Sequence, residues 1–241
     1  MACRCGRRVS AGDPLGIPRV DYGLVRVFVY VVVTDSGFAP NPFFGFCTLA
    51  TCKPRVRRSA AAGDWIVGVG SAQRRWEGKL VYVMRVDETL CFDEYWRDPR
   101  FALKRPDLGG DAERHCGDNI YHRDRATGCW VQAPGCHSHS DGTPHCGHIE
   151  RDTSPPRVLI AREFAYFGAD AVEIPLRFRP WRGVDYFTRI RGHRCNLPED
   201  LRDRFAGWLA RLAAEAGGMA GAPADCVGGP PGSGCGVPAC G

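Results

Sequence analysis

The chain has 241 residues, of which 44% are hydrophobic and 24% are charged, proportions typical of ordinary globular proteins. This composition excludes a wholly disordered or fibrous chain. The longest apolar run, residues 27–33, is far shorter than the roughly 18 residues that cross a membrane, so we expect no membrane span. The net charge is +5 and arginine far exceeds lysine, which suits phosphate-bearing partners, although a GC-rich genome produces the same bias.

The cysteines and the two ends of the chain define its expected setting and boundaries. Thirteen cysteines in a long chain that shows no export signal at its N-terminus favour reduced thiols and a cytoplasmic location. Residues 1–23 have no regular apolar pattern and are predicted to be a flexible leader. Residues 24–216 are predicted to form one domain, and residues 217–241, rich in Gly, Pro and Ala, a disordered tail.

The first predicted elements are strands. Residues 25–34 are rich in Val, Tyr and Phe on both faces, which predicts a buried central strand. Residues 65–69 and 80–86 predict two more strands, and the polar connection over residues 73–78 lets them pair as a hairpin. Residues 98–152 have no strong periodicity and predict a long inserted loop, either functional or disordered.

Two further strands and one helix complete the predicted domain. Residues 158–160 and 164–167 have strand-type sequence. The helix follows, with apolar residues at spacings of four, three, one and three that place them on one face. Pro198 suits its first turn, and Gly217 follows its end. The stripe, which we interpret as core-facing, consists of Leu201, Phe205, Trp208, Leu209 and Leu212.

Two of the predicted strands resemble a pattern of the PUA-like superfold, which includes the EVE, YTH and ASCH modules. In residues 63–71 a Gly-Asp pair opens one strand, and in residues 78–86 the next strand runs back after a Gly. This resemblance implies an α+β fold built on a strongly bent β-barrel. The C-terminal helix would pack on the barrel, and the long inserted loop would form one rim of a cleft.

The chain also resembles the prokaryotic family called nucleotide modification associated domain two, over roughly residues 25–194. That family is named for its association with systems that modify bases in nucleic acid. The resemblance therefore implies a nucleotide or nucleic acid as partner, together with other proteins of a base-modification system, but it transfers no catalytic residue. The chain departs from the family pattern in its extra cysteines and in His145 and His148, where Asn is more frequent. The motifs that carry the resemblance are residues 34–43, 47–54, 92–101, 117–121, 137–144 and 152–153.

A base pocket is the first candidate site. Aromatic rings beside an Asn amide can stack on a base and read its hydrogen-bonding edge. In PUA-like readers aromatic side chains hold a modified base, so by resemblance Trp65 or Trp96 would contribute a wall. The alternative is that the rings only plug the end of the barrel. The predicted base-binding residues are Phe38, Asn41, Phe43, Trp65, Asp118, Asn119 and Tyr121.

Basic residues form the second candidate site. Lys53, Arg55 and Arg57 alternate along a segment predicted to be extended, which would place their charges on one face as a phosphate track. The competing interpretation is an edge strand protected by charge. Arg189 and Arg191 form another basic cluster, which surface solvation also explains.

A cysteine nucleophile is the third candidate. Cys47 and Cys52 lie close together, and Lys53 follows at once; a cationic neighbour can raise the thiolate fraction that a nucleophile needs. Asp118 or His137 would transfer the proton. The alternative is inert packing, since free cysteine is often buried.

The inserted segment holds other groups that can carry chemistry. Asp118, Asn119, Tyr121, Asp141 and Asp152 could act as general acids and bases or as part of a lid, or could simply cap turns. We predict no cofactor, and a zinc ion is the alternative that the density of His and Cys leaves open. The ligands for such an ion would be Cys136, His139, Cys146 and His148, with His137 and His145 nearby.

These observations favour a protein that binds a nucleotide or a modified base within a nucleic-acid modification or defence system. The first alternative is an enzyme that modifies nucleotides or bases with a cysteine nucleophile. The second is a zinc-stabilised interaction module.

Overall fold

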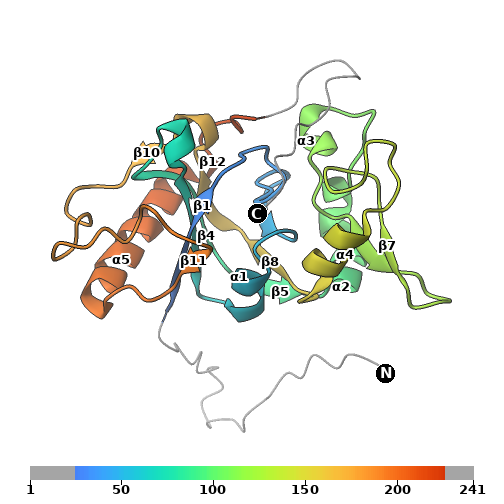
Figure 1. Ribbon diagram of the computed structural model, residues 1–241, viewed down its shortest axis with the longest axis horizontal. Helices are drawn as coiled ribbons and strands as arrows, with labels where there is room; N and C mark the ends of the chain where they lie inside the picture. Colours follow the sequence, from blue (N-terminus) through green and yellow to red (C-terminus); the bar gives the residue numbers. More distant parts are fainter. Residues whose placement is uncertain (1–24, 226–241) are drawn as a thin grey trace, which may run out of the picture.

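The computed structural model describes residues 25–225 (Figure 1). The predicted leader, residues 1–23, and residues 226–241 of the predicted tail lie outside the described residues. The first part of that tail is not disordered, which corrects the prediction: strand β12 (Gly218–Met219) pairs in parallel with β9 (Glu163–Tyr166). Beyond β12, the Asp225 carboxylate accepts the backbone N–H of Asp35.

A mixed sheet of seven strands forms the centre of the domain, in the order β11-β1-β3-β4-β9-β12, with β10 paired to β4. β1 runs parallel to β3, and β3 and β4 form the predicted antiparallel hairpin. The first strand is buried and central, as its continuous apolar sequence predicts. The remaining bounds are β1 (Val27–Val32), β3 (Trp65–Gly70), β4 (Lys79–Arg85), β10 (Val172–Glu173) and β11 (His193–Arg194).

A second sheet is joined to the first by a bent ribbon. It contains β2 (Cys47–Leu49), β8 (Val158–Ala161) and β5 (Glu88–Leu90), in that order. Arg85 of β4 pairs with Glu163, and three residues further on Glu88 of β5 pairs with Ile160, so the same register continues through the bend.

The two sheets do not close into a barrel, so the predicted PUA-like barrel is not confirmed. The reason is the pairing of β1. One edge of β1 is occupied by β3, and the other edge is paired at Val29 and Tyr30 with β11 and not with β2. Among residues 25–225 the fold is therefore α+β, with two sheets that meet at a bend and a separate two-stranded sheet of β6 (Tyr121–Arg123) and β7 (Trp130–Gln132).

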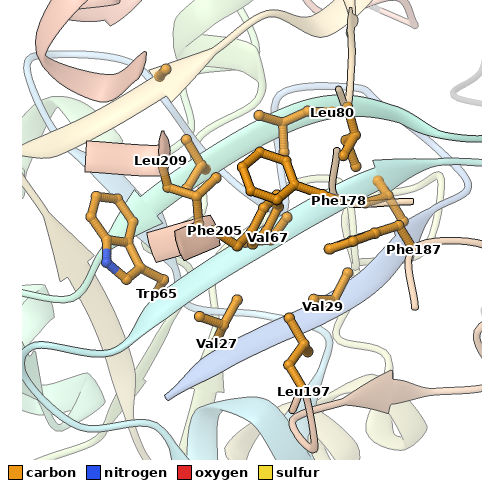
Figure 2. Close-up of a cluster of buried hydrophobic side chains, with 14 of the residues drawn as sticks. Val27, Val29, Trp65, Val67, Leu80, Phe178, Phe187, Leu197, Phe205 and Leu209 are labelled. Carbon is orange, nitrogen blue, oxygen red and sulfur yellow. The ribbon is translucent and has the colours of Figure 1, made fainter. Parts of the chain in front are cut away.

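The C-terminal helix α5 (Glu199–Ala216) covers one face of the large sheet, as its apolar stripe predicts. Leu201, Phe205 and Leu209 are fully buried in the cluster that this helix forms with the strands, and Trp208 packs against its margin. Figure 2 shows Phe205 and Leu209 beside Trp65 and Val67 of β3. Pro198 precedes the helix and Gly217 ends it at a φ of 62°.

Replacing Phe205 by alanine should destabilise the domain by about 3–5 kcal/mol, because a fully buried ring between α5 and the sheet is lost and the cavity cannot fully collapse. Urea denaturation measures this difference. Arg211→Ala, on the exposed side of the same helix, is the control and should change the free energy of unfolding by about 0.5 kcal/mol or less.

The segment predicted to be a long loop is folded into a small lobe, which lies on the opposite side of the molecule from α5 (Figure 1). A third apolar cluster, which includes Phe92, Tyr95 and Ile120, packs this lobe onto the outer face of the second sheet. No helix in the described part of the chain is long and apolar enough to cross a membrane. The elements of the lobe are α2 (Phe92–Arg97), η2 (Pro99–Lys104), α3 (Ala112–His115), β6 (Tyr121–Arg123), β7 (Trp130–Gln132) and α4 (Cys146–Thr153).

Candidate active site

The predicted base-binding residues do not form one open pocket. Trp65 is only 3% exposed and lies in the cluster under α5 (Figure 2), whereas Phe38 belongs to the cluster under the small lobe. Phe43 is buried as well, against the backbone turn at Gly37. The shared pocket is therefore wrong for these rings. Apolar rings are typical of ligand contacts and of protein cores alike, and in this fold these rings belong to the core.

Asn41 and Asp118 belong to a buried polar network instead. Thr48 Oγ1 and the Tyr95 hydroxyl each donate to the Asp118 carboxylate, at 2.7 Å. Lys104 Nζ donates to Asn41 Oδ1 at 2.5 Å. Burial raises the pKa of Asp118, although the Lys104 charge opposes this, and burial lowers the pKa of Lys104 to about 8. This network ties the loop before β2 to the small lobe, and Asp118 is placed as scaffold and not as a proton-transfer partner of a cysteine.

Asn119 is also structural. Its side-chain amide donates to the backbone carbonyls of Tyr95 at 3.0 Å and of Phe101 at 3.3 Å. These bonds link α2 and η2 to the strand that leads into β6. The amide that sequence assigned to base reading is thus engaged within the lobe.

The predicted phosphate track is wrong in its geometry. Residues expected to be extended form α1 (Pro54–Ser59), with Pro54 in the first turn. Arg57 is fully buried, and Lys53 Nζ lies 4.6 Å from the centroid of the Tyr30 ring. Arg55 remains exposed to solvent. A helical period places Arg55 and Arg57 on different faces, which charge alternation alone does not reveal.

The two candidate cysteines have different environments. Cys47 is fully buried in β2, and burial raises the pKa of its thiol well above the ordinary value. Cys52 is half-buried, in the loop just before α1, at a positive φ of 56°. A buried thiol that resists ionisation is inert, so the structure favours Cys52 over Cys47 as a nucleophile.

Cys52 in the loop before α1, His137 in the turn after β7 and Asp152 in the last turn of α4 form a chain of contacts. The Sγ atom of Cys52 lies 3.7 Å from Nε2 of His137. Nδ1 of the same imidazole lies 2.6 Å from Oδ2 of Asp152. A carboxylate that accepts Nδ1–H fixes the ring so that Nε2 faces the thiol, the relation that nucleophile, base and orienting acid have in catalytic triads.

The triad carboxylate is held from several sides. Its Oδ1 accepts the backbone N–H of Cys52 at 3.1 Å, and its Oδ2 accepts the Tyr121 hydroxyl at 3.1 Å. Arg151 Nε lies 3.4 Å from Oδ1. Gln132 donates to the backbone carbonyl of His137 at 2.9 Å, which fixes the other end of the loop. The geometry between thiol and imidazole is therefore pre-organised.

Arg57 connects the loop that carries Cys52 to the end of α4, which carries Asp152. Its guanidinium donates to the carbonyl oxygens of Cys52 at 2.8 Å and of Asp152 at 2.6 Å. It also donates to the carbonyls of Pro155 at 3.0 Å and of Arg157 at 2.7 Å. Burial lowers the pKa of Arg57 to about 10, a change that the Asp152 charge opposes, so the group is cationic at neutral pH. One side chain thus joins residues about 100 positions apart.

Burial opposes ionisation of Asp152, but the hydrogen bond from His137 and the charges of His137, Arg151 and Arg57 outweigh it and lower its pKa to about 2. An acid whose pKa is lower in the folded state than in the unfolded state stabilises the fold above pH 4, and this contribution is lost as the pH falls through 2.

We therefore expect the stability advantage of the wild type over Asp152→Asn to shrink by about 2 kcal/mol between pH 5 and pH 2, measured by urea unfolding at each pH. An advantage that is constant over this range would contradict the ionised triad carboxylate. Glu113→Gln, which alters an exposed acid in the same lobe, is the control.

Histidine rings continue outward from the triad. The His148 ring centroid lies 4.3 Å from that of His137, His145 lies 4.2 Å from His148, and His139 stacks on His145 at 4.5 Å. Burial, followed by the charges of His137, Arg151 and His145, lowers the pKa of His148 to about 4. Within residues 25–225, no group of three or more His, Cys, Asp or Glu side chains is arranged to hold a metal ion, so the proposed zinc ligands Cys136, His139, Cys146 and His148 are not assembled into a site.

An open hollow of about 420 Å³ lies between α1 and α4 next to the triad. Arg55, Arg58 and Arg151 line it, with Glu150 as the acidic residue of the lining. The connection between this hollow and the triad is Arg151, which lines the hollow and contacts Asp152 through its Nε. Its excess of positive charge suits an anionic group of a substrate.

Two parts of this site were not identified from the sequence. Arg57 was predicted to bind phosphate, and nothing in the sequence around it indicates that its side chain is buried and connects distant segments. Asp152 appeared only as one loop acid among several; its place in a motif of the family resemblance was the signal that could have separated it from Asp141.

A comparison with protein families gives the chain a broad class. The family model described as nucleotide modification associated domain 2 matches residues 24–229 of the chain, which includes the whole triad and both sheets. No curated protein and no solved structure matches the chain significantly. The chain belongs to the nucleotide modification associated domain 2 family.

Proposed function

We propose that this protein is an enzyme of nucleotide modification that uses Cys52 as its nucleophile. The observation that carries the proposal is the contact of Cys52 Sγ with His137 Nε2 at 3.7 Å, together with the bond of His137 Nδ1 to Asp152 at 2.6 Å. Catalysis by a cysteine, an alternative in the sequence analysis, takes precedence over binding alone because a binding module has no need of this arrangement.

Each triad residue has one role. Cys52 supplies the attacking sulfur, and the residue is partly exposed to solvent. His137 accepts the thiol proton at Nε2 and later returns it. Asp152 is a positioning residue that holds the imidazole through Nδ1 and stabilises its positive charge.

The chemistry of such a triad is substitution at an electrophilic carbon, such as the carbonyl or amidine carbon of a base or of its substituent. The Cys52 sulfur bonds to that carbon, and an amine or alcohol leaves with the proton that His137 took from the thiol. Water or a second amine then attacks the covalent intermediate and gives its proton to Nε2. The carbon–sulfur bond breaks, and His137 returns this proton to the Cys52 thiolate.

The hollow beside the triad supports a phosphate-bearing substrate. Arg55, Arg58 and Arg151 offer guanidinium groups that match the geometry of a phosphate, and they belong to elements that flank Cys52 in space. This set replaces the track predicted from the sequence and retains only Arg55 from it.

The test is protection of Cys52 from alkylation. Iodoacetamide should modify Cys52 of the folded protein at neutral pH, and a millimolar mixture of nucleoside 5′-monophosphates should slow this reaction several-fold. The protection should be lost in the Arg55→Ala/Arg58→Ala double variant and kept in Arg189→Ala/Arg191→Ala, which removes the same charge from exposed residues that do not line the hollow. The proposal is wrong if Cys52 is alkylated no faster than the exposed Cys129 and the nucleotides do not slow the reaction.

A further inference from the structure

A second hollow, of about 590 Å³, is lined by residues of α2, of β6 and of the segments that follow η2 and β6. Four arginines contribute to it: Arg97, Arg105, Arg123 and Arg125. Asp124 is the acidic residue of this lining. The hollow therefore carries a clear excess of positive charge, and nothing in the triad chemistry uses it.

The charge of this hollow is not neutralised within the described part of the chain. Over residues 25–225, none of the four arginines forms an ion pair, although arginines elsewhere in the fold do, such as Arg26 with Asp64. Asp124 caps its own turn by accepting the backbone N–H groups of Ala126 and Thr127. An anion in the hollow would therefore meet cations that have no competing carboxylate partner.

Aromatic rings hold part of this arrangement in place. The rings of Trp96 and His122 stack at 4.1 Å with an interplanar angle of 14°. The Arg105 guanidinium lies 4.5 Å from the Trp96 ring centroid, and that of Arg123 lies 4.2 Å from the Trp130 ring centroid. Stacked guanidinium groups lose less freedom when they bind a phosphate, so this site is partly pre-organised.

The hollow is separate from the Cys52 site. Successive side chains of a strand point to opposite faces. In β6 the Tyr121 hydroxyl reaches Asp152 of the triad, whereas His122, the next residue, stacks on Trp96 in the arginine hollow. None of Cys52, His137 and Asp152 lines the arginine hollow, and its lining shares no residue with the hollow between α1 and α4, so a group bound there does not occupy the place of the reacting carbon.

We propose that this hollow binds successive phosphates of a nucleic acid strand, as a docking site distinct from the catalytic cysteine. The lining extends from α2 to β6 and carries four arginines. Four cations along one hollow suit several phosphates of one backbone better than the single phosphate of a mononucleotide. The Trp96–His122 stack adds a flat aromatic surface of the kind that single-stranded nucleic acids contact.

The experiment is fluorescence anisotropy with a labelled twelve-nucleotide oligothymidylate at several salt concentrations. The wild type should bind the oligonucleotide, and Arg97→Ala/Arg125→Ala should weaken binding by about tenfold or more and reduce the slope of log affinity against log salt by about 1.4, as expected for two lost phosphate contacts. Both residues are exposed, so the fold should be retained.

Two control variants and one control ligand, thymidine 5′-monophosphate, make the outcome decisive. Arg189→Ala/Arg191→Ala removes the same net charge elsewhere and should change the affinity little. Cys52→Ala should bind as the wild type does, which separates this site from the proposed catalysis. Equal weakening by both arginine pairs, thymidine 5′-monophosphate binding as tightly as the oligonucleotide, or no binding at low salt would each overturn the proposal.

Discussion

The His137→Asn variant is expected to alkylate at Cys52 about tenfold or more slowly than the wild type at pH 6. At that pH only about 0.3% of an ordinary thiol is ionised, so rapid reaction depends on a base that takes the proton and on a cation that stabilises the thiolate. His137 Nε2, at 3.7 Å from the sulfur, is placed to do both. The measurement is the rate of carboxamidomethylation at Cys52, followed by mass spectrometry of the peptide that contains it.

The matched control for this variant is His139→Asn, which alters an exposed ring of the same histidine cluster and should leave the Cys52 rate unchanged. Circular dichroism and the melting temperature show whether each variant is folded. Equal rates in wild type and His137→Asn would mean that the imidazole does not activate this thiol, whatever their distance.

Replacing Arg57 by leucine is expected to destabilise the protein by about 3–5 kcal/mol, because four buried carbonyl groups lose a charged donor at once. For a domain of this size the melting temperature should fall by roughly 10 °C. The Cys52 loop and the end of α4 also lose their common connection, so the alkylation rate of Cys52 should fall even where the variant remains folded.

Arg58→Leu is the control, since Arg58 is the exposed neighbour on the same helix and makes only a 3.5 Å contact with the Ser154 carbonyl. Its free energy of unfolding should stay within about 0.5 kcal/mol of the wild type. If Arg57→Leu lowers the free energy of unfolding by less than about 1 kcal/mol, the guanidinium is not a principal connection between the Cys52 loop and α4.

Sequence predicted the elements whose signals are local. The stripe around Phe205 and Leu209 defines α5 because helical spacing and the Pro198 and Gly217 boundaries agree with one another. The β3–β4 hairpin follows in the same way from two apolar runs and a short polar connection. The barrel was wrong because its closure depends on which strand occupies the edge of β1, and the two residues of β11 that do so carry no strand signal.

The candidate site was predicted only in part, because its contacts also depend on residues that are far apart in the sequence. Cys52 and His137 were each selected by residue type, but their contact spans 85 positions and only the tertiary fold brings them together. Trp65 and Arg57 were misassigned because an aromatic or cationic side chain has the same sequence signature at a surface and in the interior. Burial separates these cases, and burial is a property of the completed fold.

The most direct test of the account is the identity of the thiol that substoichiometric iodoacetamide modifies first among the cysteines of residues 25–225. If Cys52 is the nucleophile of a triad with His137 and Asp152, its peptide should carry the label before those of the exposed Cys129, Cys146 and Cys195. If labelling follows solvent exposure alone, so that Cys129, Cys146 and Cys195 are fully modified while Cys52 is unmodified, Cys52 is not the activated nucleophile.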